Sequence, residues 1–131
     1  MGAIDLKSNI SVGRSVAYGA KTSTATGTGV EVADYNSCCV VIDAGAWTDG
    51  THTVAVQDSD DNSTFAAVAD SLLDGTEPVI DGAADDDQQY YIGYKGNKRY
   101  VRVVVTVASA TTGAIYGAYV ILGNPKDLPK N

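Results

Sequence analysis

The chain has 131 residues, of which 44% are hydrophobic and 19% are charged, and these values exclude a disordered protein and a chain with two independent cores. The formal net charge of −7 argues against a nucleic-acid-binding protein, because phosphate contacts need clustered Lys and Arg side chains. No apolar run approaches the ~20 residues that a transmembrane helix requires, so we expect no membrane partner.

The acidic residues are almost all Asp. Among the sixteen acids only Glu31 and Glu77 are Glu. Asp favours turns and helix caps, whereas Glu favours helix interiors. Together with the abundance of Val, Thr, Tyr and Gly, this bias predicts an all-β chain with many turns.

The charges are segregated along the chain. No Lys or Arg lies between Thr22 and Tyr94, where fourteen of the sixteen acids are found, whereas residues 95–131 hold six of the nine basic residues. Two interpretations stay open. Either the late basic segment lies beside the acidic turns and neutralises them, or the molecule presents a two-faced surface to a partner of matching charge.

Residues 1–11 form a predicted N-terminal arm. The segment is polar except for the isolated Ile4, Leu6 and Ile10, which we take as candidate contacts to a partner protein. It lacks the charged and then apolar pattern of a signal peptide, so we expect synthesis in a cytoplasm. Such an arm can become ordered when it binds a neighbouring subunit.

Residues 37–43 form a nearly continuous apolar run, which predicts a strand covered on both faces. The adjacent Cys38 and Cys39 in this strand point to opposite faces, so they cannot easily bond to each other. Weaker strand candidates are residues 12–18, 29–32, 65–68 and 77–80, and one helical turn is expected at residues 70–74.

Three later or central segments alternate between apolar and polar residues, and this period of two predicts half-buried strands. They are residues 51–58, 89–94 and 100–107. Residues 114–122, like residues 37–43, are apolar almost throughout and predict another strand that is covered on both faces.

We therefore expect one domain, an antiparallel β-sandwich or barrel of about eight strands at residues 12–123. Residues 124–131 form a predicted C-terminal tail that contains Leu128 as a further candidate contact. Pro125 and Pro129 lie in this tail, and proline cannot continue a central strand.

The segment from Asp58 to Thr64 is the most suggestive metal motif. Asp58, Asp60 and Asn62 are weak calcium candidates, because oxygen-bearing side chains alternate as they do in calcium loops. Ser63 replaces the glycine of an EF-hand, and the bidentate Glu is missing. A hairpin turn held by side-chain-to-backbone hydrogen bonds accounts for the same residues, so the sequence predicts no metal and no other cofactor.

The sequence nominates no catalytic residue. His52 is the single histidine, it has no partners with metal-ligand spacing, and no serine lies in a nucleophile elbow. Trp47 precedes an Asp-Gly turn, and an aromatic side chain that stays exposed there would anchor a protein contact or stack on a sugar ring.

The order of these segments resembles the small structural proteins of tailed phages, in particular capsid decoration (cement) proteins. The resemblance rests on the strand that ends in Val41-Ile-Asp-Ala-Gly, the hairpin Thr53 to Phe65, the strand Arg99 to Val107 and the ending Val120-Ile-Leu-Gly-Asn-Pro. It covers residues 37–125 and implies a β-sandwich of jelly-roll type. It also implies a homo-oligomer, often a trimer, on the capsid surface of a virion, with the major capsid protein as partner.

Two other functions stay open. One is a carbohydrate-binding module of jelly-roll type, with Trp47 or exposed tyrosines as stacking platforms. The other keeps the phage context but places the protein in the tail or at the head–tail junction. The number of copies in the particle separates the shell from the junction, and glycan binding separates both from the carbohydrate module.

Overall fold

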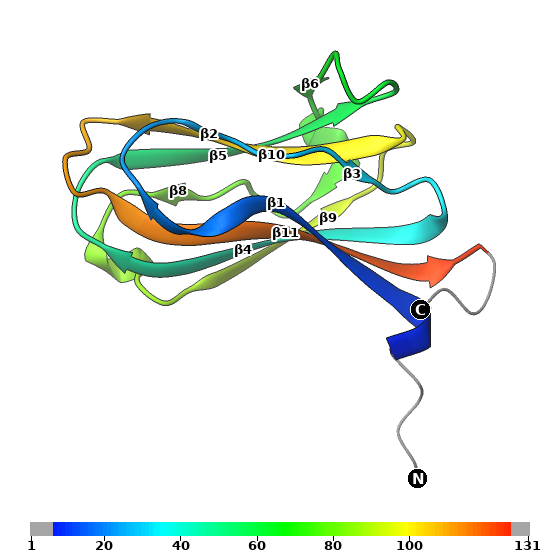
Figure 1. The fold of residues 1–131 in the computed structure, drawn as a ribbon, viewed down its shortest axis with the longest axis horizontal. Helices are drawn as coiled ribbons and strands as arrows, with labels where there is room; N and C mark the ends of the chain where they lie inside the picture. Colours follow the sequence, from blue (N-terminus) through cyan, green and yellow to red (C-terminus); the bar gives the residue numbers. More distant parts are fainter. Residues whose placement is uncertain (1–6, 127–131) are drawn as a thin grey trace, which may run out of the picture.

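The computed structural model describes residues 7–126, which fold into two antiparallel β-sheets packed face to face (Figure 1). The predicted all-β sandwich is confirmed, with eleven strands in the described residues because five of them are only two residues long. The strands are β1 (Ile10–Lys21), β2 (Ala25–Thr26), β3 (Val30–Glu31), β4 (Tyr35–Trp47), β5 (Thr51–Ser59), β6 (Ala66–Ala67), β7 (Leu73–Asp74), β8 (Val79–Ile80), β9 (Gln89–Tyr94), β10 (Tyr100–Ala108) and β11 (Ala114–Pro125). The 3-10 turns are η1 (Lys7–Asn9), η2 (Asp70–Leu72) and η3 (Ala83–Asp85).

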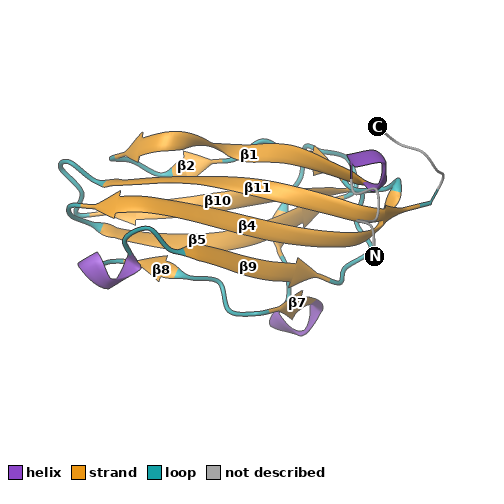
Figure 2. Cartoon of the chain, turned by 90° about the horizontal axis from the view of Figure 1, so that it is seen from below, coloured by secondary structure: helices purple, strands orange, loops and turns teal. Residues whose placement is uncertain are grey.

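The two sheets have different strand orders. The five-stranded sheet has the order β1-β11-β4-β9-β7, and Figure 2 looks onto it. The six-stranded sheet has the path β2-β10-β5-β6, with β3 also pairing with β10 and β8 with β5. Sequence-adjacent strands therefore often lie in opposite sheets, and the first strand pairs with the last.

The six-stranded sheet contributes its alternating valines to the core. In β10 Val101, Val103 and Val105 have no exposed surface, as the period of two predicts. Val103 lies opposite Val56 of β5 in the antiparallel ladder. Burying a valine of this kind stabilises the fold by ~1.5–3 kcal/mol relative to leaving it exposed.

The five-stranded sheet faces these valines with one side of each central strand. Its fully buried side chains are Val40, Ile42, Ile92, Tyr116 and Val120. The residues between them along β4 and β11 point to the opposite side of the sheet. The core is thus one layer between two sheets, with no helix in the described residues covering either outer face.

The strands extend beyond the predicted sandwich at both ends. β1 begins at Ile10, which lies in the predicted arm, and β11 continues through Pro125, where the sequence predicts a tail. The pairing explains how this strand can include Pro125. The backbone N–H of Lys126 donates to the carbonyl of Asp34, so the nitrogen of Pro125 points to the other side, towards β1. Since β1 has already ended at the Ile10–Gly123 pair, the lack of an N–H at Pro125 costs no hydrogen bond of the ladder.

Most strands of the described residues overlap segments that the sequence predicts, and three of these segments were predicted by alternation. β9 matches its predicted segment, β10 and β5 each extend one residue further, and the expected turn after residue 70 is η2. β2 and β7 were not predicted, because two paired residues leave no periodic pattern in the sequence.

Candidate functional site

The outer side of the five-stranded sheet is the candidate site, and we call it the apolar face. Its apolar side chains come from four neighbouring strands: Val12 and Tyr18 of β1, Ile115, Tyr119 and Ile121 of β11, Cys39 and Val41 of β4, and Tyr91 of β9. The ladder aligns them in rows, for example Val12, Ile121 and Cys39. The rows form one continuous surface across the sheet.

Three large side chains of this face are at least half exposed. Tyr91 is 67% exposed, Val12 54% and Tyr18 50%. The remaining apolar side chains are half-buried by their neighbours in the sheet. An exposed apolar surface that is continuous over several strands is typical of a protein contact rather than of a free surface.

Two glycines of the apolar face leave room for the ring of Tyr18 to lie against the sheet. Tyr18 lies across Gly117 and reaches Gly45, and a Cβ atom at Gly117 would stand only 2.9 Å from the Tyr18 Cα. The ring of Tyr18 can therefore lie along the sheet because both positions lack a side chain. A flat surface of this kind suits close packing against another flat surface.

The charges on this face are few and lie to either side of β11. Arg14 is on β1, and it makes no hydrogen bond or ion pair within the described residues. Asp43 is on β4, where its Oδ1 accepts a hydrogen bond of 3.0 Å from the Gln89 side chain, and Asp74 lies beside Gly93 at the β7 edge. The β1 side is thus basic and the β4–β7 side acidic.

The outer side of the six-stranded sheet is different in character. β5 and β10 present Thr51, Thr53, Gln57, Arg102 and Thr106 there. Arg102 donates to the Gln57 side chain at 2.9 and 2.7 Å, and its guanidinium lies 4.0 Å from the centre of the Phe65 ring. Arg102 and Gln57 are paired with each other and the threonines are exposed, so this surface is typical of a solvated sheet.

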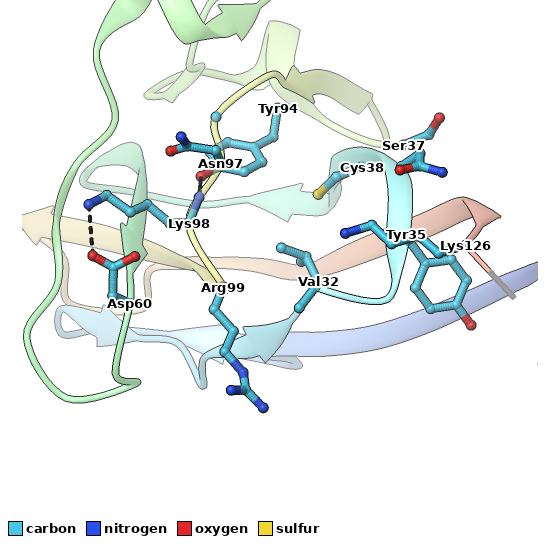
Figure 3. Close-up of a pocket in the computed structure, with 13 residues that line it drawn as sticks. Val32, Tyr35, Ser37, Cys38, Asp60, Tyr94, Asn97, Lys98, Arg99 and Lys126 are labelled. Carbon is cyan, nitrogen blue, oxygen red and sulfur yellow. Dashed lines mark hydrogen bonds and ion pairs between the residues drawn. The ribbon is translucent and has the colours of Figure 1, made fainter.

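A groove of about 400 Å³ lies at the end of the sandwich where both chain ends leave the sheet (Figure 3). Lys98 forms a 2.8 Å ion pair with Asp60 at its rim, and Arg99 forms a 3.0 Å ion pair with Glu31. The Tyr94 hydroxyl donates to Asp58 and accepts from the Lys98 N–H. Burial and the bond to Asp58 raise the pKa of Tyr94 above its usual range.

These two ion pairs bear on the segregated charges of the sequence. Each joins a basic residue of the late segment to an acid of the middle segment, as the neutralising interpretation expects. Arg14 does not take part, so its positive charge stays available on the apolar face.

Cys38 lines the groove, whereas Cys39 lies on the apolar face, and no disulfide joins them. Burial, with a smaller contribution from Cys39, raises the pKa of the Cys38 thiol to about 12. A thiol with this pKa stays protonated at neutral pH and is a poor nucleophile.

The calcium candidates are engaged elsewhere. Asp58 accepts from Tyr94, Asp60 pairs with Lys98, and the Asn62 side chain packs against Gly29. The neighbouring Asp61 instead holds the turn, since its Oδ1 accepts hydrogen bonds from Ser59, Ser63 and Thr64. Within residues 7–126 no cluster of His, Cys, Asp or Glu is arranged to hold a metal ion.

The predicted contact residues have mixed outcomes. Trp47 is half-buried against the core, and its indole N–H donates to the Gly50 carbonyl at 2.9 Å, so the structure does not present it as an exposed anchor. Ile10 belongs to β1 and pairs with Gly123. Ile4, Leu6 and Leu128 lie outside the described residues.

His52 is part of the core. It is fully buried, its Nδ1 lies 2.9 Å from the Tyr116 hydroxyl, and its Nε2 lies 3.1 Å from the Asp49 carbonyl. Both ring nitrogens therefore have structural partners.

Comparison with protein-family models, with curated proteins and with solved structures finds no match to this chain. No helix among the described residues is long and apolar enough to cross a membrane.

The apolar face was not nominated from the sequence, although a signal for it is present. Residues 37–43 and 114–122 are apolar on both sides, and the sequence predicts strands covered on both faces. β4 and β11 are covered on one side only by the described residues of the chain. The missing cover is the observation that a function has to explain.

Proposed function

We propose that the chain is a non-catalytic structural protein of a tailed-phage virion, which decorates the capsid and stabilises it by bridging major capsid subunits. The observation that carries the assembly role is the uncovered apolar face of the five-stranded sheet. The resemblance of residues 37–125 to capsid decoration proteins supports the virion location on the capsid surface.

We assign the sandwich to the jelly-roll type within this proposal. Four strands of one sheet have the order β1-β11-β4-β9, and the path of the other sheet is β2-β10-β5-β6. The first long strand pairs with the last, and the chain passes between the sheets as in two nested Greek keys. This order supports the jelly roll that the resemblance implies.

The proposed mechanism is a shift of equilibrium towards the assembled shell. A protein that binds the assembled lattice but not free capsid subunits stabilises the lattice by mass action. Many copies on one shell multiply weak individual contacts. No reaction step is needed, and the buried, paired His52 and the protonated Cys38 suit a protein without catalysis.

The end of the sandwich beside the groove is the proposed side towards the capsid. β1 starts there and β11 ends there, because the pairs Ile10–Gly123 and Tyr35–Pro125 lie at the same end of the sandwich. The terminal segments with Ile4, Leu6 and Leu128 start from this end and are the proposed contacts to the major capsid protein.

Mass spectrometry of purified particles from the phage that encodes this chain tests the proposal. We expect hundreds of copies per particle, in a fixed ratio to the major capsid protein. A single ring of copies would move the protein to the tail or the head–tail junction, and absence from the particle would overturn the virion assignment.

A carbohydrate-binding module is the second candidate function, because Tyr91 and Tyr18 present exposed rings on the apolar face. A stacked sugar also needs polar groups around it, and the described part of this face offers few beyond Arg14, Asp43, Asp74 and Gln89. Screening on a glycan array, with and without a chelator, separates the two functions. We expect no binding in either condition.

A further inference from the structure

We propose that a second copy of this chain covers the apolar face, so that two copies pair through their five-stranded sheets. This inference goes beyond the proposed function and does not depend on the virion assignment. It depends on the composition, flatness and charge of one sheet face.

The composition of the two central strands indicates a second cover. β11 and β4 are paired along most of their length and both carry apolar residues on both sides, for example Val120 inside and Ile121 outside. Strands with apolar residues on both sides are typical of sheets that are covered on both faces. One cover is the six-stranded sheet, and the second has to come from outside residues 7–126.

The shape of the apolar face suits a second copy. Gly45, Gly93 and Gly117 lie on the apolar face, and Tyr18 lies down across two of them. At Gly117 and Gly45 the face therefore carries only the ring of Tyr18, whereas Tyr119 and Tyr91 lie in a neighbouring row. Two sheets pack face to face at ~10 Å, and such packing needs side chains of moderate height on both surfaces. The face of a second copy meets this condition.

The charges of the apolar face also suit a second copy. A chain with a net charge of −7 repels its own copies unless they meet through a surface that is close to neutral. The apolar face has Arg14 on its β1 side and Asp43 and Asp74 on its β4–β7 side. When one copy is turned over by a two-fold axis parallel to the strands, the basic side of each copy lies over the acidic side of the other.

The symmetry of this contact sets the stoichiometry. A face that meets the same face of another copy makes an isologous contact, which closes after two copies. The trimer that the resemblance implies would need two different contact surfaces on each copy. The inferred pair is therefore distinguishable from that trimer by mass alone.

The test is the oligomeric state of the purified full chain, measured by light scattering after size-exclusion chromatography. We expect a mass twice the 13.5 kDa of one chain, with dissociation on dilution over a range of about 1–100 μM. Val12→Asp places a charge on the apolar face and should give the single-chain mass. A trimeric mass, or a native chain that stays monomeric, would overturn the inference.

Val79→Asp is the matched control. Val79 is 42% exposed on β8, in the other sheet, and Val12 is 54% exposed, so the same substitution is made at similar exposure. We expect Val79→Asp to retain the pair. If both variants keep the native mass, or if both lose it, the apolar face is not the contact.

A native thiol provides a second readout. Cys39 lies on the apolar face and Cys38 points inward, so a Cys38→Ala chain reports alkylation of Cys39 alone. We expect alkylation to become faster as the protein is diluted, since dilution uncovers the face. A rate that is independent of concentration would show that no second copy covers the face, and would overturn the pair.

These experiments are independent of the proposed function. Oligomeric state is measured in solution, whereas the virion role is measured on particles. A monomer that is present in hundreds of copies per particle overturns the pair and leaves the function standing, and a pair that is absent from particles does the reverse.

Discussion

At the scale of single residues, the buried pair of His52 and Tyr116 explains why a polar side chain lies on the core side of β5. The two rings meet edge to face with centroids 5.3 Å apart, and the Tyr116 hydroxyl lies 2.9 Å from the His52 Nδ1. Each ring supplies apolar area, and each supplies the polar partner that the other needs in the core. The sequence indicates that His52 faces inward, but its partner is 64 residues away and leaves no local signal.

Tyr116→Phe should destabilise the fold by about 1–3 kcal/mol, because it leaves a ring nitrogen of His52 buried without a partner. Urea unfolding at neutral pH measures this difference. Tyr119→Phe is the control, since Tyr119 points to the outer side of the same strand and its hydroxyl makes no hydrogen bond within the described residues. Equal stability of the two variants would contradict the structural role of the pair.

Asp49 closes the connection between β10 and β11. Its Oδ1 accepts hydrogen bonds from the backbone N–H groups of Thr111, Thr112 and Gly113, the last at 2.7 Å. These bonds lower the pKa of the Asp49 carboxyl below its usual value, and the bond from Gly113 has the largest effect. Gly113 has a φ of 83°, and a Cβ atom there would overlap the Lys21 carbonyl, so the turn needs glycine as well as the carboxylate.

Asp49→Asn should lower the melting temperature at pH 7 and should reduce its dependence on acid pH. A carboxyl whose pKa is lowered by folding contributes stability above its unfolded pKa, and this contribution is lost as the pH falls through the lower folded value. Calorimetry between pH 7 and pH 2.5 measures both effects. Asp70→Asn is the control, because Asp70 is exposed and its carboxylate makes no hydrogen bond within the described residues. It should change neither the melting temperature at pH 7 nor its dependence on acid pH.

At the scale of elements, the strands whose bounds could be predicted best are those whose two faces have different environments. β5 and β10 alternate because one side of each faces the core, and β9 follows the same pattern. β1 runs from residue 10 to residue 21, longer than predicted, because register shifts between Arg14 and Gly19 interrupt its alternation. Short strands such as β2 depend on pairing with a distant partner, which a local pattern does not contain.

The loop between β5 and β6 has a composition that suits either a calcium site or a turn held by hydrogen bonds. Alternating oxygen-bearing side chains can bind calcium, but here Asp61 accepts three hydrogen bonds within the turn while Asp58 and Asp60 turn to Tyr94 and Lys98. The backbone bonds from Thr64 and Ser63 and the side-chain bond from Ser59 lower the pKa of Asp61.

Addition of calcium should leave the melting temperature unchanged, because the carboxylates of this loop do not converge on one point. Differential scanning fluorimetry with millimolar calcium and with a chelator measures this. Asp61→Asn should instead destabilise the chain equally in both conditions. A melting temperature that rises with calcium and falls with the chelator would restore the metal site.

At the scale of the whole molecule, the sequence contains a signal for the apolar face but does not identify the residues that form it. Two runs without alternation, residues 37–43 and 114–122, predict cover on both faces but not the source of that cover. The rows that join Val12 to Ile121, or Arg14 to Tyr119, arise from the β1–β11 register. Only the folded chain shows that these residues form one surface and that Trp47 does not belong to it.

Capsid stability is the property that the proposed function has to change. If the protein binds the shell and not its free subunits, particles that lack it should release their contents at a lower temperature, since occupied sites stabilise the lattice by RT ln(1 + [L]/Kd). Addition of purified protein to such particles should restore the native release temperature and then saturate, as a finite set of sites requires. Heat release followed with a DNA-binding dye measures both effects. The Val79→Asp chain should restore stability like the native one, and particles that are equally heat-stable without the protein would contradict the role.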